Sequence, residues 1–460
     1  MESASRQCHP TVARPDTQNA SGQRLIQRAY QDSVGAAHTA FGMDLQATVE
    51  KLLNPGVILY LADMNRDVRL LGRSLHSLSP KSVDLAEGFR VASRIPMSSS
   101  TINPTRSEMQ VVSCAGGGVT RLDRRPLPEP ATGELRLRLR CCGLCGTDLF
   151  KLTNDTAAPG TVLGHELVGV VDAVGDGVDD FAVGERVVVP HHVACGHCSL
   201  CRRGSETLCA VFRETLLEPG GFSEYVLVRE RAVRLAARKL PDSLRDESAV
   251  FLEPAACVMR SIRNAHLSAS LLEDAAGRAE VCVVILGAGS MGLLHLLVLR
   301  ALYPGISVVV CDARQDRLES ARTFGAGHVT LPGADLEAAV RAASRGLGAD
   351  AVFDTVGGAR LLDSALGLAR SGGTAVLFAH APAAENAGFE LNELFKEERR
   401  VVGTYSGGLD DQREIFELLV SGGLDPTPLV THRLPLSDFG RALELARSYT
   451  ALKILLEPES

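Results

Sequence analysis

Four cysteines stand close together in the middle of the chain, at Cys195, Cys198, Cys201 and Cys209. Their spacing, C-x2-C-x2-C-x7-C, allows one loop to bring four thiolates to a single tetrahedral zinc ion. In a small secreted domain the same cysteines could form disulfides, but this chain has 460 residues and shows no secretory signal. The spacing therefore favours a metal site.

A second set of possible zinc ligands surrounds this cysteine cluster. Cys145 lies in C-G-T-D, His165 and Glu166 lie in G-H-E, and Glu253 lies in F-L-E-P-A-A. Cysteine, histidine and carboxylate side chains all bind zinc, and a catalytic zinc commonly keeps three protein ligands and one open position. Each residue is weak on its own, because a lone histidine is more often structural. The ordered set of motifs is much more specific than its parts.

A nucleotide-binding pattern follows. Gly287, Gly289 and Gly292 form G-x-G-x-x-G directly after the apolar run V-C-V-V-I-L. Glycines allow the backbone to turn tightly and to approach a pyrophosphate at the N-terminus of the next helix. The strand before the motif and the helix after it give the context that the motif needs.

The residue that would select the cofactor lies at the end of the next strand. Asp312 follows Gly292 by 20 residues, where a carboxylate accepts hydrogen bonds from ribose hydroxyls and repels a 2′-phosphate. This favours NAD over NADP, although Arg314 and Arg317 lie nearby and weaken the argument. Arg317 has two interpretations: it stacks on adenine, or it is a solvated arginine at a helix start.

The elements that must position these residues change in kind along the chain. Apolar runs broken by glycines predict strands within 109–128, 133–142, 167–175 and 185–190, which is typical of a small β domain. From about residue 260, strands alternate with helices, including helices from Ser290, near 315–324 and near 360–370. This alternation predicts a parallel sheet with helices on both faces. The last ~55 residues return to short mixed elements, with a helix near 437–448.

Residues 1–108 differ from the rest. The first twenty residues are polar, 45–62 have a weak apolar pattern consistent with a helix and a short strand, and 98–108 resemble a linker. Three interpretations of this segment remain open. Translation truly begins at Met109 and the upstream residues are an artefact, or the segment is an arginine-rich transit peptide, or it is a poorly ordered or partner-binding tail.

Composition limits the class of protein. The formal net charge of −7 argues against nucleic-acid binding. The sequence contains no run of ~18 apolar residues, so we expect no membrane span. Twelve cysteines without a signal peptide favour a reducing compartment, so we expect a cytoplasmic protein.

From about residue 109 to 460, these motifs in this order resemble the zinc-dependent medium-chain alcohol dehydrogenases, in particular the polyol, sugar and threonine dehydrogenase branch. The resemblance implies an α/β protein in which a GroES-like β domain carries catalytic and structural zinc sites and a Rossmann domain binds NAD. It implies a GroES-like domain over 109–256, completed by 404–460, and a Rossmann domain over 257–403. Residues 1–108 form an extension outside it.

The resemblance also implies roles for individual residues. Cys145 and His165 would be zinc ligands, while either Glu166 or Glu253 would be the third ligand in the resting state. Asp148 would orient the histidine, Thr147 would take the substrate proton, and Lys453 would meet the cofactor pyrophosphate. The cysteine cluster would hold the structural zinc, through Cys195, Cys198, Cys201 and Cys209.

One position departs from the family pattern. Some relatives carry a histidine five residues after the zinc-binding cysteine, which passes the proton to solvent; here that position is Phe150. The proton would then leave through cofactor hydroxyls and water. His191 and His192 are nearby, but nothing in their spacing requires more than a structural or solvated role.

The expected function is the reversible oxidation of a secondary alcohol to a ketone, with hydride transfer to NAD. The alcohol would be a polyol, a sugar or a hydroxy amino acid, and the protein would be a homodimer or homotetramer. Two alternatives remain: a zinc-free NADPH reductase of enones or quinones, and a non-enzymatic zinc protein that senses NAD. The complete ligand set argues against both.

Overall fold

The computed structural model describes residues 107–267, 281–382 and 384–459. The description below concerns the unit Ser98–Ser460. The expected helix and strand within 45–62 and most of the linker at 98–108 lie outside the described residues. Of the helices that are described, none combines the length and apolar character needed to cross a membrane.

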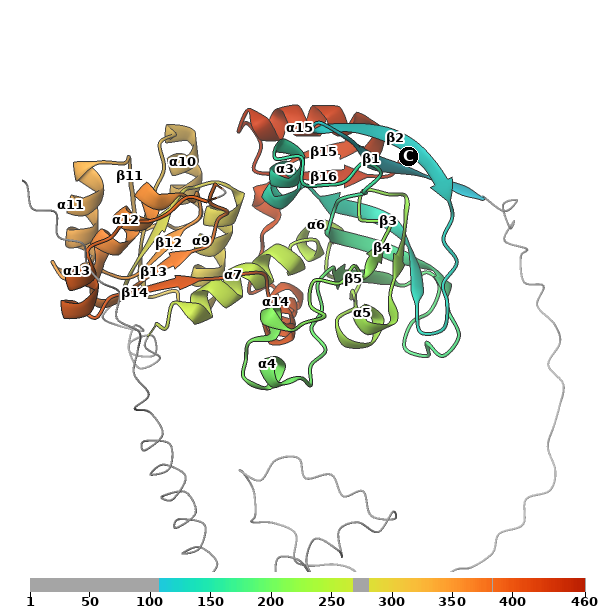
Figure 1. The fold of residues 1–460 in the computed structure, drawn as a ribbon, viewed down its shortest axis with the longest axis horizontal. Helices are drawn as coiled ribbons and strands as arrows, with labels where there is room; N and C mark the ends of the chain where they lie inside the picture. Colours follow the sequence, from blue (N-terminus) through green and yellow to red (C-terminus); the bar gives the residue numbers. More distant parts are fainter. Residues whose placement is uncertain (1–106, 268–280, 383, 460) are drawn as a thin grey trace, which may run out of the picture. The chain divides into compact units, whose positions relative to one another are not determined.

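The unit begins with a long antiparallel hairpin, coloured cyan in Figure 1, which joins β1 (Glu108–Gly116) to β2 (Val119–Pro126). The sequence suggested strand structure across this stretch but not the turn within it. Gly117 and Gly118 make the turn with φ values of +60° and +73°, a region that glycine enters without steric cost.

An eight-stranded sheet follows, with the order β15-β16-β3-β4-β5-β8, and with β7 pairing β3 and β6. Leu135, Leu137 and Leu139 alternate along β3 and are fully buried, while the arginines between them are more exposed. This alternation is typical of a strand with one face on the core. The strands from this part of the chain are β3 (Leu135–Gly143), β4 (Glu166–Val174), β5 (Arg186–Pro190), β6 (Leu217–Glu218), β7 (Tyr225–Val228) and β8 (Arg238–Lys239).

Short helices connect these strands and carry several of the candidate residues. Cys145 caps the first of them: its thiolate accepts from the N–H of Thr147, and Asp148 accepts from the N–H of Cys145. The helices are α3 (Gly146–Thr153), α4 (Ser199–Arg202), η1 (Glu206–Leu208), α5 (Glu230–Leu235), α6 (Asp246–Ala249) and α7 (Leu252–Asn264).

A six-stranded parallel sheet has the order β11-β10-β9-β12-β13-β14, and helices cover both of its faces. In chain order this is 3-2-1-4-5-6, the arrangement of a Rossmann domain, whose ligand crevice opens where the strand order reverses, between β9 and β12. The strands are β9 (Cys282–Leu286), β10 (Ser307–Cys311), β11 (His328–Thr330), β12 (Ala349–Asp354), β13 (Ala369–Leu377) and β14 (Arg400–Gly403). The helices are α9 (Ser290–Leu302), α10 (Gln315–Thr323), α11 (Ala334–Ala343), α12 (Ala359–Leu368) and α13 (Leu391–Lys396).

The chain then returns to the first sheet. Helix α14 (Leu409–Ser421) packs along α7, as both views show. Strand β15 (Val430–Pro435) pairs in parallel with β16 (Lys453–Glu457), and β16 pairs antiparallel with β3, with Leu456 opposite Cys142. The remaining elements are η2 (Thr427–Leu429), η3 (Leu436–Asp438) and α15 (Phe439–Arg447). The combination of a β domain and a Rossmann-type domain confirms the expected fold class.

Candidate active site and metal centres

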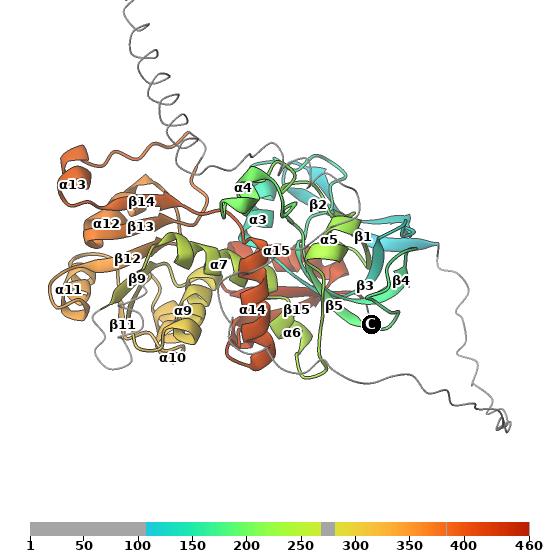
Figure 2. The same ribbon diagram turned by 90° about the horizontal axis from the view of Figure 1, so that it is seen from below.

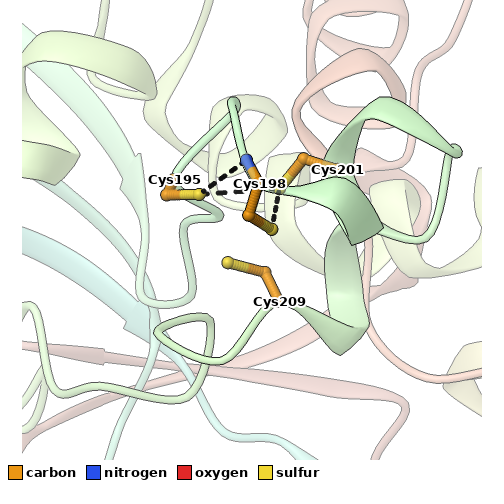
Figure 3. A group of neighbouring side chains, drawn as sticks. All are labelled: Cys195, Cys198, Cys201 and Cys209. Atoms are coloured by element: carbon orange, nitrogen blue, oxygen red, sulfur yellow. Dashed lines mark hydrogen bonds between the residues drawn. The ribbon is translucent and has the colours of Figure 1, made fainter.

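The four central cysteines converge on one point. Their sulfur atoms all lie within 4.8 Å of one another, and Figure 3 shows them pointing toward a common centre from the loop, α4 and the end of η1. The shortest distance, 3.4 Å between the sulfurs of Cys198 and Cys201, is far longer than a disulfide bond of about 2.05 Å. This geometry fits four thiolates around a zinc ion.

The electrostatics of this cluster agree with a cation site. The backbone of His197, with a further contribution from Cys198, lowers the pKa of the Cys195 thiol to about 6, whereas burial raises the pKa of Cys201 to about 12. One thiol is therefore ready to ionise and a neighbour resists ionising. A bound cation removes this conflict, since a metal ligand must be a thiolate.

A second group of donors forms around the end of β3. The ligand atoms of Cys145, His165 and Glu166 lie within 4.8 Å of one another. Two glycines make this possible: a Cβ on Gly143 would collide with the Glu166 carboxylate, and one on Gly164 would lie 2.7 Å from the backbone nitrogen of Phe222. One sulfur, one imidazole and one carboxylate suit a zinc ion with an open coordination position.

Asp148 holds this donor group in place from a fully buried position. Its carboxylate lies 3.4 Å from Nδ1 of His165 and accepts hydrogen bonds from the backbone N–H groups of Cys145 (3.0 Å) and Gly164 (3.3 Å). Burial alone would lower the pKa of His165, but the Asp148 charge raises it well above its usual range. The same charge favours a cation on the other side of the ring.

Lys453 lies at this metal centre and has a partner that the resemblance did not imply. Its ammonium group donates to both carboxylate oxygens of Glu166, at 2.8 and 2.6 Å, and both side chains are buried. The resemblance assigned Lys453 to the cofactor pyrophosphate. In the structure the Glu166 carboxylate holds the ammonium group, because β16 pairs with β3 and β3 pairs in turn with β4, where Glu166 lies.

Glu253 lies close by but outside the three-residue donor group. One of its oxygens is 3.5 Å from Sγ of Cys257 and 3.9 Å from Nδ1 of His191. Burial, with a contribution from the charge of Glu166, raises its pKa. This places Glu166, rather than Glu253, with Cys145 and His165 in the structure.

A cleft of about 1400 Å³ connects the metal centre with the glycine motif. Cys145, Leu149 and Lys453 lie on its wall together with the loop from Gly287 to Gly292. Gly287 has a φ of +97°, and a Cβ there would lie 2.6 Å from Cγ2 of Val356; a Cβ on Gly292 would collide with the Gly287 carbonyl. Close packing therefore requires glycine at positions 287 and 292, whereas a Cβ on Gly289 would meet no atom within 4 Å.

Asp312 and Arg317 both line this cleft. The two carboxylate oxygens of Asp312 accept from the backbone N–H groups of Ala288 (2.7 Å) and Arg314 (2.8 Å), so Asp312 also braces the glycine loop. The Arg317 guanidinium is mostly buried and donates to the carbonyls of Tyr449 and Ala451. The solvated-arginine interpretation is therefore wrong for Arg317; stacking on adenine stays a prediction.

A second cavity, of about 610 Å³, lies on the other side of the metal ligands. His165 and Asp148 border it, together with His191 and His192. The ring centroid of His191 lies 4.5 Å from that of His165 and 3.6 Å from that of His192. Sequence spacing gave these two histidines no role, and only the fold shows that they form part of the site wall.

Thr147 and Phe150 lie on helix α3 beside the metal centre. The Thr147 N–H donates to Sγ of Cys145 at 3.5 Å. Phe150 stacks on His380 from the parallel-sheet domain, with 4.5 Å between ring centroids and 13° between planes. A histidine is therefore present next to the position where some relatives carry one, but it comes from the end of β13.

Known proteins share this architecture. The family profile described as an alcohol dehydrogenase GroES-like domain matches residues 131–239, and the profile described as a zinc-binding dehydrogenase matches residues 291–421. The L-threonine 3-dehydrogenase of Rhizobium johnstonii is 30% identical over 73% of this chain and 94% of its own length. The sorbitol dehydrogenase of Bacillus subtilis is 28% identical over 74% of this chain and 94% of its own length.

Solved structures agree. The RspB alcohol dehydrogenase of Escherichia coli CFT073, complexed with NADH, superposes with a TM-score of 0.65 at 26% identity, over 76% of this chain and all of that one. A zinc-binding dehydrogenase of Sinorhizobium meliloti bound to NADP gives a TM-score of 0.67 at 26% identity, over 77% of this chain and all of that one. The chain therefore belongs to the zinc-binding alcohol dehydrogenase family, with a GroES-like domain and a Rossmann-type nucleotide-binding domain.

Proposed function

We propose that this protein reversibly oxidises a secondary alcohol to a ketone and transfers the hydride to NAD. One observation carries the proposal: the donor group of Cys145, His165 and Glu166 lies beside the same cleft as the glycine loop at 287–292. A metal-polarised hydroxyl and a nicotinamide could therefore meet in one place.

The donor atoms fit the metals that the family uses. Cys145, His165 and Glu166 would hold a catalytic zinc, and the cysteine cluster would hold a structural zinc. Zinc bound at the catalytic site supplies a Lewis acid, which makes the substrate hydroxyl easier to deprotonate. Asp148 fixes the ring of His165, and Lys453 fixes the carboxylate of Glu166. Glu253 is the alternative carboxylate ligand for the catalytic zinc.

The reaction also requires that the substrate hydroxyl lose its proton. We assign the proton acceptor role to the Thr147 hydroxyl, which stands two residues after Cys145 at the start of α3. Phe150 cannot pass the proton on, so cofactor hydroxyls and water would complete the path. Bound NAD supplies the hydride acceptor, while the protein supplies alignment.

The position of Asp312 supports NAD over NADP. A carboxylate held by two backbone N–H groups at the end of β10 would accept from ribose hydroxyls and repel a 2′-phosphate. Gly287, Gly289 and Gly292 would leave room for the pyrophosphate. Arg317 would lie near the adenine, where the cleft meets the carbonyls of Tyr449 and Ala451.

Several further assignments belong to the same proposal. The substrate is a polyol, a sugar or a hydroxy amino acid, the protein is a homodimer or homotetramer, and its location is the cytoplasm. Residues 109–256 with 404–460 form the catalytic domain, and 257–403 form the nucleotide-binding domain. All eleven cysteines among the described residues are free thiols, which suits a reducing compartment.

The test is NADH formation by the zinc-loaded protein, with NAD and NADP each supplied to a panel of polyols, sugars and β-hydroxy amino acids. Cys145→Ser should abolish turnover while NADH binding, measured by fluorescence, stays nearly unchanged. Cys282→Ala, which replaces a buried cysteine in the parallel sheet, is the matched control and should remain active. Normal turnover by the Cys145→Ser variant would refute the metal assignment.

A further inference from the structure

Three cationic side chains line the cavity beside the donor group, and the chemistry above uses none of them. Arg125 donates to the Gly160 carbonyl, whereas Lys151 and Arg213 have exposed side chains. Lys151 and Arg213 both line this cavity, which His165 and Asp148 border. We propose that the cavity binds an anionic group, a carboxylate or a phosphate, carried by the alcohol substrate. This inference rests on the proposed function and narrows its substrate to an anionic secondary alcohol.

The charge balance of the cavity wall is the first support. The two glutamates on the wall are already paired with arginines: Glu214 with Arg231 at 2.8 Å, and Glu218 with Arg229 at 2.5 Å. Asp148 faces His165, as described above. Within 107–267, 281–382 and 384–459, no acidic group pairs with Lys151 or Arg213. The cavity therefore has an excess of positive charge next to the metal centre.

The second support is that Arg213 is held in place before any ligand arrives. Its guanidinium lies 4.7 Å from the ring centroid of Tyr405, and Tyr405 contacts the rings of Phe212 and His192. Stacking of this kind stabilises a guanidinium and reduces the entropy lost on binding. A planar guanidinium can then donate two parallel hydrogen bonds to a carboxylate or phosphate.

Lys151 connects the anion site to the reacting centre. It stands four residues after Thr147 on α3, so the two side chains share one face of the helix. An anionic group bound near Lys151 would therefore lie on the same side of α3 as the proposed proton acceptor. Burial is the main cause that lowers the pKa of His192 to about 4, and nearby charges that include those of Lys151 and Arg213 contribute.

The third support is a pair of buried histidine nitrogens on the cavity wall that make no hydrogen bond. Nδ1 of His192 is buried and lacks a hydrogen-bond partner among the described residues, and Nδ1 of His191, also without a hydrogen bond, has only the Glu253 carboxylate at 3.9 Å. A buried polar atom of this kind costs free energy unless a ligand or water satisfies it. The cavity volume of about 610 Å³ suits a small molecule with several oxygens. Hydroxy acids and polyol phosphates both have this chemistry.

The first experiment measures anion binding without turnover. Zinc-loaded protein is saturated with NADH, which covers the pyrophosphate site, and is titrated with inorganic phosphate in a calorimeter. Arg213→Gln and Lys151→Gln should each weaken phosphate binding by about tenfold to a hundredfold. Arg322→Gln removes an exposed arginine that lines neither cavity and should change nothing. Equal binding by all four proteins would overturn the proposal.

The second experiment distinguishes the anion's source and separates this inference from the function on which it rests. Matched pairs are compared: sorbitol with sorbitol 6-phosphate, and butan-2-ol with 3-hydroxybutyrate, which carries a carboxylate in place of one methyl group. In at least one pair, the unaltered enzyme should have the higher kcat/KM for the anionic substrate. Arg213→Gln should raise the KM for that anionic substrate, and it should leave kcat for the neutral substrate unchanged. Equal turnover within both pairs would overturn the anion site and leave the dehydrogenase standing. Variant-sensitive phosphate binding without any turnover would uphold the anion site and count against the oxidoreductase.

Discussion

Lys453 and Glu166 form a buried ion pair, with the ammonium nitrogen 2.6 and 2.8 Å from the two carboxylate oxygens. The pair joins β16 to the start of β4 and places a positive charge beside a proposed metal ligand. Removing one partner of a buried ion pair leaves the other charge uncompensated, which is costly in free energy. The contribution of this pair to stability should therefore depend on whether a metal is bound beside it.

Replacing the lysine should reveal this dependence. Lys453→Met leaves the Glu166 carboxylate buried without its partner and should lower the free energy of unfolding of metal-free protein by about 3–5 kcal/mol. The loss should be smaller with zinc bound, because the cation then neutralises the carboxylate. Urea unfolding with and without zinc measures both values. Lys239→Met, which breaks the more exposed pair with Glu185, is the control and should change little in either state. An equal loss with and without zinc would contradict the coupling.

The cysteine lobe should depend on its metal for structure. Its buried cluster consists of only four residues, Ala194, Cys201, Cys209 and Phe212, which is too small a core to hold a loop by apolar packing. Cys198→Ser should reduce the zinc content from about two ions per chain to about one. It should also make residues 195–212 sensitive to limited proteolysis. Full zinc content, or unchanged protection of the segment, would argue against the site, and Cys282→Ala provides the comparison.

Asp312 should set both cofactor choice and loop stability. Asp312→Ala removes the acceptor for the N–H groups of Ala288 and Arg314. Catalytic efficiency with NAD should fall about tenfold to a hundredfold, while efficiency with NADP should hold or rise. Steady-state kinetics with both cofactors measure the ratio. Glu319→Ala removes an exposed carboxylate from the helix that follows Asp312, α10, and should leave the ratio unchanged. An Asp312→Ala enzyme with the original preference would take Asp312 out of this role.

One buried histidine should make stability depend on pH. His295 is fully buried on α9 between Ser261 Oγ (2.8 Å) and the Met291 carbonyl (2.7 Å), and burial lowers its pKa to about 4. The unfolded chain binds a proton near pH 6.5 and the native state does not, so stability is complete above about pH 6.5 and falls as the pH drops toward 4. The full effect is about 3 kcal/mol.

This effect can be isolated by comparing variants. Urea unfolding between pH 7.5 and 5 should show a shallower pH slope for His295→Gln than for the unaltered protein. His328→Gln, at an exposed position on β11, should keep the original slope. Identical slopes for all three proteins would show that His295 is not responsible.

Much of the fold was predictable from local patterns. The run V-C-V-V-I-L became β9, and the helix expected from Ser290 begins there and ends at Leu302. Helix α11 was not predicted, although Leu336 and Val340, four residues apart, form its buried side. Strand β11 is three residues long, too short for any period to show. Such elements are fixed by the sheet they join rather than by their own sequence.

The site divides in the same way. Short motifs in the sequence located the cysteine cluster, the donor group and the glycine loop. Each of these motifs consists of residues that are close in sequence, so it can be recognised without knowing the fold. The partner of Lys453 could not be predicted, since Glu166 lies 287 residues away and only the return of β16 to β3 brings them together. Lys151, Arg213 and His192 come from different segments of the chain, and only the folded structure brings them to one cavity.

The late arrival of β16 also sets the order of events during synthesis. At about 5–20 residues per second, a ribosome adds Lys453 roughly 15–60 s after Glu166. The parallel sheet over 282–403 is continuous in sequence and can form in that interval, whereas the Cys142–Gly143 end of β3 must wait without its partner strand. The nascent catalytic domain therefore passes through a period in which its proposed metal ligands have been synthesised but β16 has not. Chaperone contact with the emerging chain is expected to concentrate in this period.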